Sequence, residues 1–222
     1  MKKLFFQTVT RFLLSVILLF ALIFLPAGTL KFFNGWLFMA ILFVPMLFIG
    51  IFLFFKNPEL LKKRLNLKEK QKEQSLVIKL SSIMFVCGFV VAGLGVRLNW
   101  LLLPRIFSIF ASLVFLFGYF LYFTVLKQNA FLSRTVELQE NHKVIDTGLY
   151  KIVRHPMYSA TLLMFLSMPL VLGSVFAFAI FLIYPFIIAK RIKNEETFLE
   201  KELLGYAEYK QKVKYKIIPF LW

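Results

Sequence analysis

The sequence predicts an all-α integral membrane protein, and three observations support this fold class. Of the 222 residues, 60% are apolar and only 17% are charged, and the mean hydropathy is +0.78. A soluble domain is nearer half apolar and a quarter charged, so a water-soluble core cannot bury this much apolar surface. Several apolar runs are long enough to cross a bilayer as helices, and the basic residues gather in alternate connections between them.

Four long apolar runs are expected to be transmembrane helices. About 20 helical residues cross the hydrocarbon core, and each run approaches or exceeds this length. The first run follows Lys2 and Lys3, as in a signal peptide, but it is too long for one and ends without a small-residue cleavage site, which predicts an uncleaved span. The four runs are 12–30, 36–55, 76–96 and 101–126.

The apolar region after Pro156 predicts a helical hairpin. Residues 157–190 are interrupted by Pro169, Gly173-Ser174 and Pro185, and they are too few for two full straight spans and a turn. We expect a short helix to about residue 172, a turn at Gly173-Ser174 and a longer helix that leaves the membrane near Arg191. The whole chain would then have five or six membrane segments.

The charge distribution predicts the orientation. The N-terminus, the long connections 56–75 and 127–157 and the C-terminal segment carry all 11 acidic residues. Together with Lys79, just after the first of these connections, they also carry every one of the 27 basic residues except Lys31, Arg97 and Arg105. The positive-inside rule therefore predicts that both termini are cytoplasmic. It also accounts for the net charge of +16 without nucleic acid as a partner.

The chain is expected to have two regions. Residues 1–126 form a four-span transmembrane region with a cytoplasmic loop at 56–79, and residues 127–222 carry most of the polar chemistry. Asn57-Pro58 suits a helix start, so an interfacial amphipathic helix and a solvated loop both stay open for the residues that follow. The single Cys87 excludes an intrachain disulfide. No His, Cys or carboxylate cluster has metal-ligand spacing, and no metal is expected.

Both histidines, His142 and His155, lie in the long connection 127–157. His155 precedes a proline and should be extended, while Pro156 suits the first position of the next helix. A helix start at the membrane surface, with free N–H groups and a positive dipole end, can bind a carboxylate or a phosphate. A purely structural helix start is the alternative.

A second polar cluster consists of Arg191, Glu195 and Glu196. Arg191 and Glu195 are four residues apart and share a helix face, whereas Glu196 points about 100° away. A surface ion pair would explain this pattern. A functional site is the alternative, because ionisable groups at the mouth of a membrane hairpin are often functional.

These clusters, in this order and spacing, resemble the isoprenylcysteine carboxyl methyltransferase family and related membrane phospholipid methyltransferases. The resemblance is dense over 131–222 and includes an early segment, Asn57-Pro58-Glu59-Leu60-Leu61. The other matching motifs are Arg134-Thr135-Val136, His142, Gly148-x-Tyr150, Arg154-His155-Pro156-Met157-Tyr158, Arg191-x-x-x-Glu195-Glu196-x-x-Leu199, Gly205-x-x-x-Tyr209 and Ile218-Pro219-Phe220.

The resemblance implies a membrane enzyme that uses S-adenosyl-L-methionine without a Rossmann domain, with 127–222 as its catalytic region. The cofactor would lie on the cytoplasmic side, and a lipophilic substrate would enter from the bilayer. Arg191 would contact the substrate, and Arg191, Glu195 and Glu196 would be the catalytic residues. The cofactor-binding residues carried over from the family are His142, Lys143, Val144, Ile145, Tyr150, His155, Pro156, Met157, Tyr158 and Glu195.

The expected reaction is carboxyl O-methylation of an isoprenylcysteine-like or other lipophilic acid. A carboxylate is already ionised at neutral pH and needs no general base, whereas an amine acceptor would need Glu195 or Glu196 as a base. Methylation of a phospholipid or small lipid is the alternative, and a non-enzymatic membrane scaffold or transporter component is the alternative from another class. A multi-pass protein of a bacterial inner membrane is the expected setting.

Overall fold

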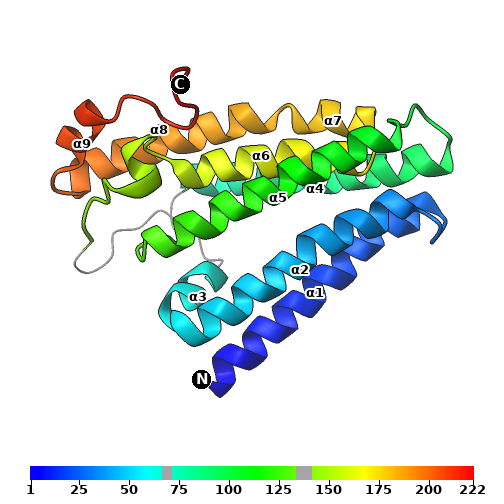
Figure 1. Cartoon of the computed structure of the whole chain (residues 1–222), viewed down its shortest axis with the longest axis horizontal. Coiled ribbons are helices and arrows are strands. Elements are labelled where there is room, and N and C mark those ends of the chain that lie inside the picture. Colours follow the sequence, from blue (N-terminus) through cyan, green and yellow to red (C-terminus); the bar gives the residue numbers. More distant parts are fainter. Residues whose placement is uncertain (67–71, 134–141) are drawn as a thin grey trace.

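The computed structural model describes residues 1–66, 72–133 and 142–222, and of residues 72 and 73 only the backbone. Within these residues the regular structure is helical, which confirms the predicted all-α class. The motif Arg134-Thr135-Val136 and residues 67–71 of the 56–79 loop lie outside the described residues. The helices are α1 (Lys2–Ala27), α2 (Phe33–Lys56), α3 (Pro58–Leu65), α4 (Lys72–Arg97), α5 (Arg105–Gln128), the short 3₁₀ helix η1 (Gly148–Lys151), α6 (Pro156–Val171), α7 (Val175–Phe181), α8 (Tyr184–Glu202) and α9 (Tyr206–Lys212) (Figure 1).

Five segments among the described residues are long and apolar enough to cross a membrane. Four of them are α1, α2, α4 and α5, as the apolar runs predict, and the fifth is α7 with α8. The helices extend beyond the predicted runs at most ends, because flanking polar residues continue a helix outside the hydrocarbon. α1 instead ends three residues early, at Ala27: Gly28 takes a φ of 67° and donates its N–H to Phe24 O and Leu25 O.

The predicted hairpin is confirmed, with one correction in its second arm. α6 ends at Val171, and Gly173 turns the chain at a φ of 75° before α7 begins. The expected single long second helix is wrong, because α7 ends at Phe181 and α8 starts at Tyr184. Pro185 lies in the first turn of α8, where its missing N–H breaks no helical hydrogen bond.

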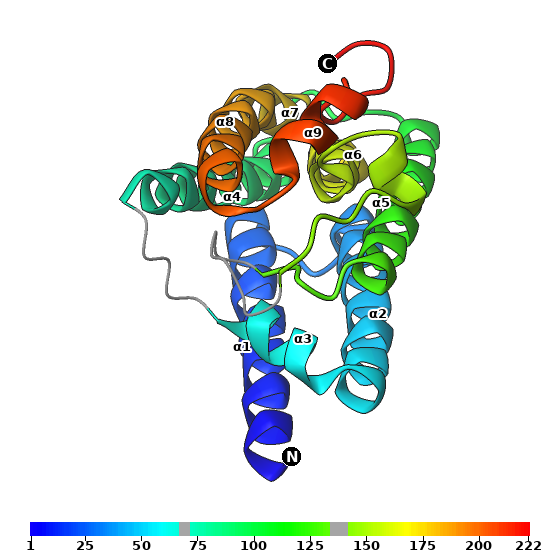
Figure 2. The same ribbon diagram turned by 90° about the vertical axis from the view of Figure 1, so that its left-hand side faces the viewer.

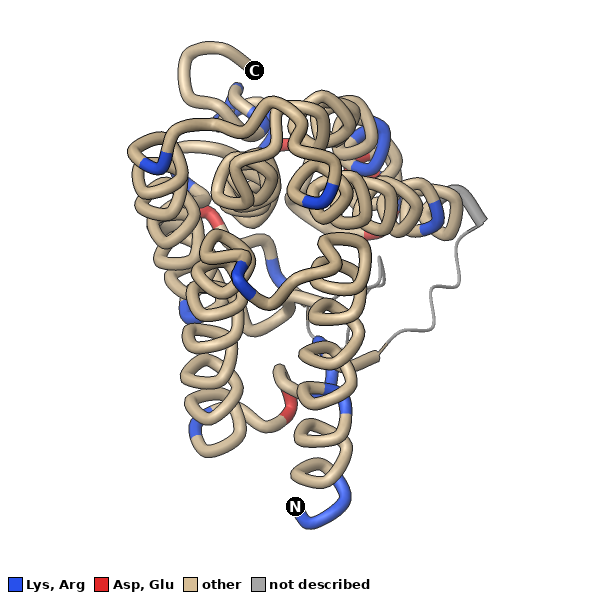
Figure 3. The backbone as a smooth tube through the Cα atoms, turned by 90° about the vertical axis from the view of Figure 1, so that its right-hand side faces the viewer, with Lys and Arg blue, Asp and Glu red and all other residues tan. Residues whose placement is uncertain are grey.

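The polar connections gather at one end of the bundle, as the alternation of long and short connections predicts. α1 and α2 both lie beneath the group formed by α4 to α8 (Figure 1). We call the end shared by the N-terminus, α3, the α5–α6 connection and α9 the polar end (Figure 2). Seen from the other end, long stretches of the helices carry no charged residue (Figure 3).

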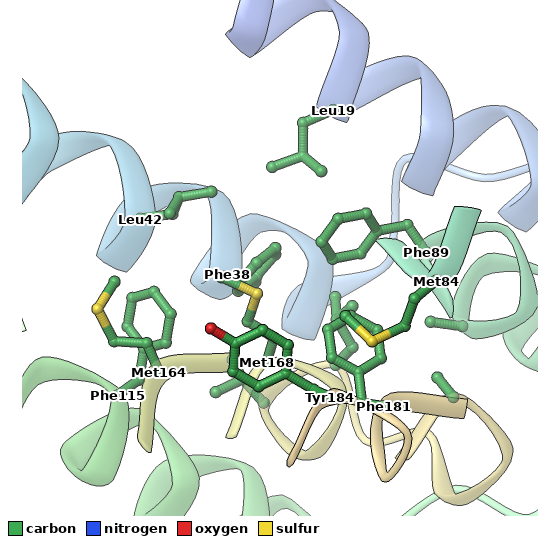
Figure 4. Packing of buried hydrophobic residues seen from close by; sticks show 14 of the residues in the cluster. Leu19, Phe38, Leu42, Met84, Phe89, Phe115, Met164, Met168, Phe181 and Tyr184 are labelled. Atoms are coloured by element: carbon green, nitrogen blue, oxygen red, sulfur yellow. The ribbon is translucent and has the colours of Figure 1, made fainter. Parts of the chain in front are cut away.

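Aromatic packing and close backbone approaches join the two groups of helices. Phe38 of α2 lies with its ring centroid 5.7 Å from Phe89 of α4 and 5.9 Å from Phe115 of α5 (Figure 4). A Cβ at Gly93 would lie 2.4 Å from Ile23 O, so only glycine lets α4 approach α1 this closely. Small residues serve this purpose at helix contacts in membranes. The core thereby fixes the helices that line the cavity described next.

Candidate functional site

A cavity of about 740 Å³ lies between α2, α4, α5, α6 and α8 and extends to the polar end. Its membrane part is lined by apolar side chains such as Leu42, Phe85 and Met168, and its polar part is lined by side chains from the α5–α6 connection, α8 and α9. A ligand with an apolar body and a polar head would match this distribution.

A row of three polar side chains, Arg191, Tyr158 and Glu195, lines the cavity where its two parts meet. Arg191 Nε donates to the Tyr158 hydroxyl at 2.8 Å, and that hydroxyl donates to the Glu195 carboxylate. The guanidinium also lies over the Tyr158 ring, 6.0 Å from its centroid. The prediction that Arg191 and Glu195 share one face of the helix is confirmed. One cation and one carboxylate thus face the same cavity.

Glu196 lies in a different environment from its neighbour Glu195. Its carboxylate accepts from Arg154 Nε at 2.7 Å and lies 3.1 Å from His155 Nε2. All three side chains are buried, and Glu196 is not among the residues that line the cavity. A buried ion pair of this kind holds its elements together as long as both charges are present. The geometry therefore gives Glu196 contacts with α6 rather than with the cavity.

The C-terminal segment holds the start of α6 in place. Arg154 Nη1 donates to the carbonyls of Val213 and Lys214 at 2.6 and 2.8 Å. The backbone N–H groups of Arg154 and His155 donate to Tyr215 O and Lys216 O at 2.9 and 2.8 Å. His155 is the N-cap and Pro156 the first residue of α6, as predicted. The N–H groups that were expected to be free at this helix start are in part taken by the C-terminal carbonyls.

The segment 142–145 lines the polar part of the cavity and is anchored by aromatic contacts. The His142 ring stacks on Phe131 with a centroid distance of 4.6 Å. Burial, and next the positive charge of Lys63, lower the pKa of His142, against a smaller opposite effect of Glu195. The ring is therefore neutral at pH 7, and its buried Nδ1 has no hydrogen-bond partner within residues 1–66, 72–133 and 142–222. A neutral imidazole with an unpaired nitrogen beside a cavity is suited to a polar ligand.

Tyr150 links η1 to both neighbouring elements. Its hydroxyl accepts from Asn129 Nδ2 at 2.9 Å, and its carbonyl accepts from the Tyr209 hydroxyl at 2.7 Å. Burial raises the pKa of the Tyr150 hydroxyl, so that this group stays protonated. Tyr150 thus joins α5, η1 and α9 around the polar part of the cavity.

The structure brings most of the predicted site residues together around this one cavity. Those that line it are His142, Lys143, Val144, Ile145, Tyr150, His155, Met157, Tyr158, Arg191 and Glu195. Pro156 starts the helix that carries Met157 and Tyr158, and Glu196 packs behind the cavity wall. Among the described residues, no group of three His, Cys, Asp or Glu side chains is placed to hold a metal ion.

Several cavity residues were not predicted from the sequence. Arg64 of α3 donates to the Tyr122 hydroxyl and, at 3.3 Å, to Ser133 O. Arg64 belongs to a run of basic residues that the positive-inside rule already explains, and Tyr122 lies within the apolar run 101–126. For Arg64 the only signal is its proximity to the Asn57-Pro58 motif, where α3 indeed starts: the Asn57 side chain accepts from Leu60 N at 3.1 Å. Tyr206 is a third such residue.

A part of the chain that supplies residues to this cavity is similar to known proteins. Residues 110–201, from α5 through α8, match the model of the isoprenylcysteine carboxyl methyltransferase (ICMT) family. The chain is 36% identical over 91 residues to protein-S-isoprenylcysteine O-methyltransferase B from Arabidopsis thaliana, a match that covers 39% of this chain and 44% of that protein. The chain thus aligns with less than half the length of this curated relative. The resemblance predicted from the motifs is confirmed for residues 110–201, the part of this multi-pass chain that matches the isoprenylcysteine carboxyl methyltransferase family.

Proposed function

We propose that this protein is a membrane-embedded, S-adenosyl-L-methionine-dependent methyltransferase that methylates the carboxylate of an isoprenylcysteine-like or other lipophilic acid. The observation that carries the proposal is that one cavity of about 740 Å³ has both an apolar part among the candidate membrane spans and a polar part beyond them, with Arg191 between the two. The family match of 110–201 supports the reaction class, because this region supplies α6, α8 and most of the polar cavity wall.

The donor set of the polar part fits S-adenosyl-L-methionine. The cofactor combines a purine, ribose hydroxyls, an amino acid and a positively charged sulfonium. Glu195 supplies a carboxylate for hydroxyl, ammonium or sulfonium groups, and the unpaired Nδ1 of His142 supplies a hydrogen-bonding atom. The bound cofactor would supply the activated methyl group. The residues proposed to hold it are His142, Lys143, Val144, Ile145, Tyr150, His155, Met157, Tyr158 and Glu195, with Pro156 setting the helix start.

The proposed role of Arg191 is to hold and orient the acceptor carboxylate. A guanidinium can bind a carboxylate in a bidentate geometry, and its Nε contact with Tyr158 at 2.8 Å fixes its direction. In-line methyl transfer requires the reacting atoms about 3–3.5 Å apart and water excluded, and the apolar part of the cavity favours both. Glu196 was expected to be catalytic. We instead propose that it positions Arg154 and His155.

The second candidate is methylation of an amine or hydroxyl on a phospholipid or small lipid. It is favoured by one observation: the Glu195 carboxylate lines the cavity and could accept a proton from the acceptor. The two reactions differ in their dependence on pH. The rate of carboxylate methylation should be flat above about pH 5, whereas the rate with an amine should rise as the amine loses its proton.

The proposed setting is a bacterial inner membrane, with the polar end and the active site on the cytoplasmic side. The charge distribution supports this orientation, because the N-terminus, the long connections and the C-terminal segment of the sequence carry nearly all the basic residues. Membrane lipids and a lipophilic substrate that enters from the bilayer are the proposed partners, and no nucleic acid is needed to explain the charge.

The test is calorimetric binding of S-adenosylhomocysteine to the purified protein in detergent. The wild type should bind saturably, and Glu195→Gln should bind much more weakly, because the carboxylate faces the cavity. Glu202→Gln is the matched control, since Glu202 is an exposed carboxylate at the end of the same helix. Absence of binding by folded wild-type protein would refute the proposal.

A further inference from the structure

Tyr206, on α9, is a buried residue of the cavity wall, and its hydroxyl has no hydrogen-bond partner among the described residues. The residue is only 4% exposed and belongs to the cavity wall. Its hydroxyl oxygen is fully buried and makes no hydrogen bond within the structure. Buried hydroxyl groups nearly always have a partner, so an unpaired one that lines a cavity indicates a group that a ligand satisfies. Tyr206 lies outside the family-matched residues 110–201.

Tyr209 on the same short helix shows the usual arrangement. It is 5% exposed, and its hydroxyl donates to Tyr150 O at 2.7 Å. The rings of Tyr206 and Tyr209 are neighbours, with centroids 5.8 Å apart. Two buried tyrosines on one helix thus differ in their hydrogen bonding. The Tyr209 hydroxyl donates to a backbone carbonyl, whereas the Tyr206 hydroxyl has no partner among the described residues.

The position of Tyr206 is fixed by contacts on both sides of α9. Lys210 pairs with Glu200 of α8, and Lys212 Nζ lies 2.9 Å from Asp146 Oδ2 of the α5–α6 connection. The helix also continues into Val213, whose carbonyl accepts from Arg154 at 2.6 Å. These contacts hold α9, and with it Tyr206, against the polar part of the cavity.

The electrostatic surroundings make this hydroxyl a donor. Burial, followed by the negative charges of Glu196 and Glu195, raises the pKa of the Tyr206 hydroxyl above the usual value for tyrosine. The phenol therefore keeps its proton. The same two carboxylates disfavour a second anion nearby, so the matching group is a neutral acceptor such as a ribose oxygen or a purine nitrogen.

We propose that Tyr206 is a further ligand-binding residue of this site, whose hydroxyl donates a hydrogen bond to a neutral acceptor on the nucleoside part of the methyl donor. This inference rests on the proposed function. It adds a contact from α9 to those made by the α5–α6 connection, α6 and α8, so that the methyl donor is enclosed from the C-terminal side as well.

Two isosteric variants, Tyr206→Phe and Tyr209→Phe, test the inference with two measurements each. The first is the melting temperature of the protein without added ligand, and the second is calorimetric binding of S-adenosylhomocysteine. Tyr206→Phe should melt at or above the wild-type temperature, because it removes a buried hydroxyl that has no partner. It should bind S-adenosylhomocysteine about tenfold more weakly. Tyr209→Phe should melt at a lower temperature, because it leaves Tyr150 O without its donor.

Two results would overturn the inference while leaving the proposed function intact. One is wild-type affinity of Tyr206→Phe for S-adenosylhomocysteine. The other is a melting temperature of Tyr206→Phe that falls as far as that of Tyr209→Phe, which would assign the hydroxyl to the fold. Failure of the wild type itself to bind S-adenosylhomocysteine would instead refute the proposed function, and this inference with it.

Discussion

Two adjacent carboxylates, Glu195 and Glu196, have different surroundings in this protein. A rotation of about 100° around the axis of α8 separates the two side chains. Glu195 therefore contacts Tyr158 at the cavity, whereas Glu196 contacts Arg154 behind it. A buried charge is tolerated only when it is paired, and Glu196 is paired with Arg154 at 2.7 Å. Substitution of Glu196 should therefore affect mainly stability, and substitution of Glu195 mainly ligand binding.

Replacement of Glu196 should chiefly affect stability. Glu196→Ala leaves the Arg154 guanidinium buried without its partner, which typically costs about 3–5 kcal/mol. The free energy of unfolding of the detergent-solubilised protein should fall by an amount of this order. Glu195→Ala should change it far less and should weaken binding of S-adenosylhomocysteine instead. Equal loss of stability in both variants would contradict the separation.

His142 should make stability depend on pH. Its pKa is lowered in the folded protein, so the unfolded chain binds this proton more readily. The folded state should therefore lose stability as the pH falls below the unfolded pKa of about 6.5. Melting temperatures measured between about pH 7.5 and 5.5 should decline less in His142→Gln than in the wild type. An identical decline in both would show that another group is responsible.

At the scale of single elements, close helix contacts depend on glycine. Gly118 of α5 faces α6, where an added Cβ would lie 2.7 Å from Met164 Cγ and 3.1 Å from Ala160 O. Met164 lines the cavity, and both residues belong to α6, the helix that carries Met157 and Tyr158. A shift between α5 and α6 would therefore disturb the cavity as well as the packing.

Gly118→Ala should lower the melting temperature and weaken binding of S-adenosylhomocysteine, because the two helices must move apart. Overpacking of this kind typically costs about 1–3 kcal/mol. Gly50→Ala of α2 is the matched control for the melting temperature alone, since an added Cβ there has no described atom within 4 Å but Gly50 itself lines the cavity. The control should melt at or above the wild-type temperature, because alanine favours a helix over glycine. If Gly118→Ala changed neither the melting temperature nor the binding of S-adenosylhomocysteine, α5 and α6 would be able to move apart at little cost.

At the scale of the whole molecule, the alternation of polar and apolar connections decides which groups share one side of the membrane. The structure places the N-terminus, α3, the α5–α6 connection and α9 at one end (Figure 2). The cavity is lined from both predicted regions, 1–126 and 127–222, because α2, α4 and α5 form its membrane part. The N-terminal spans therefore form part of the proposed binding site.

Cysteine labelling can test the orientation of the polar end. In a Cys87→Ser background, Lys31→Cys and Lys201→Cys place one exposed thiol at each end of the bundle. A membrane-impermeant maleimide added to intact bacterial cells or spheroplasts should label position 31 and not position 201. The reverse pattern in inside-out vesicles would complete the result. Labelling of position 201 from outside would contradict the proposed cytoplasmic active site.

The sequence by itself determined the helices and the outline of the site. Apolar runs of bilayer length and the Pro and Gly positions follow from local physics, because the bilayer forces each span to satisfy its own backbone. The order of short polar motifs identified ten of the residues that line the cavity, including His142, Tyr158 and Glu195.

Only the tertiary structure decided which partner each of these side chains contacts. Spacing along α8 could not show that Glu196 faces Arg154, which in turn donates to a C-terminal carbonyl, because these partners come from distant parts of the chain. It also could not distinguish Tyr206 from Tyr209, whose hydroxyls differ only in the contacts that the folded protein provides. Helix periodicity fixes the direction of a side chain around its own axis, whereas its partner depends on how the helices pack.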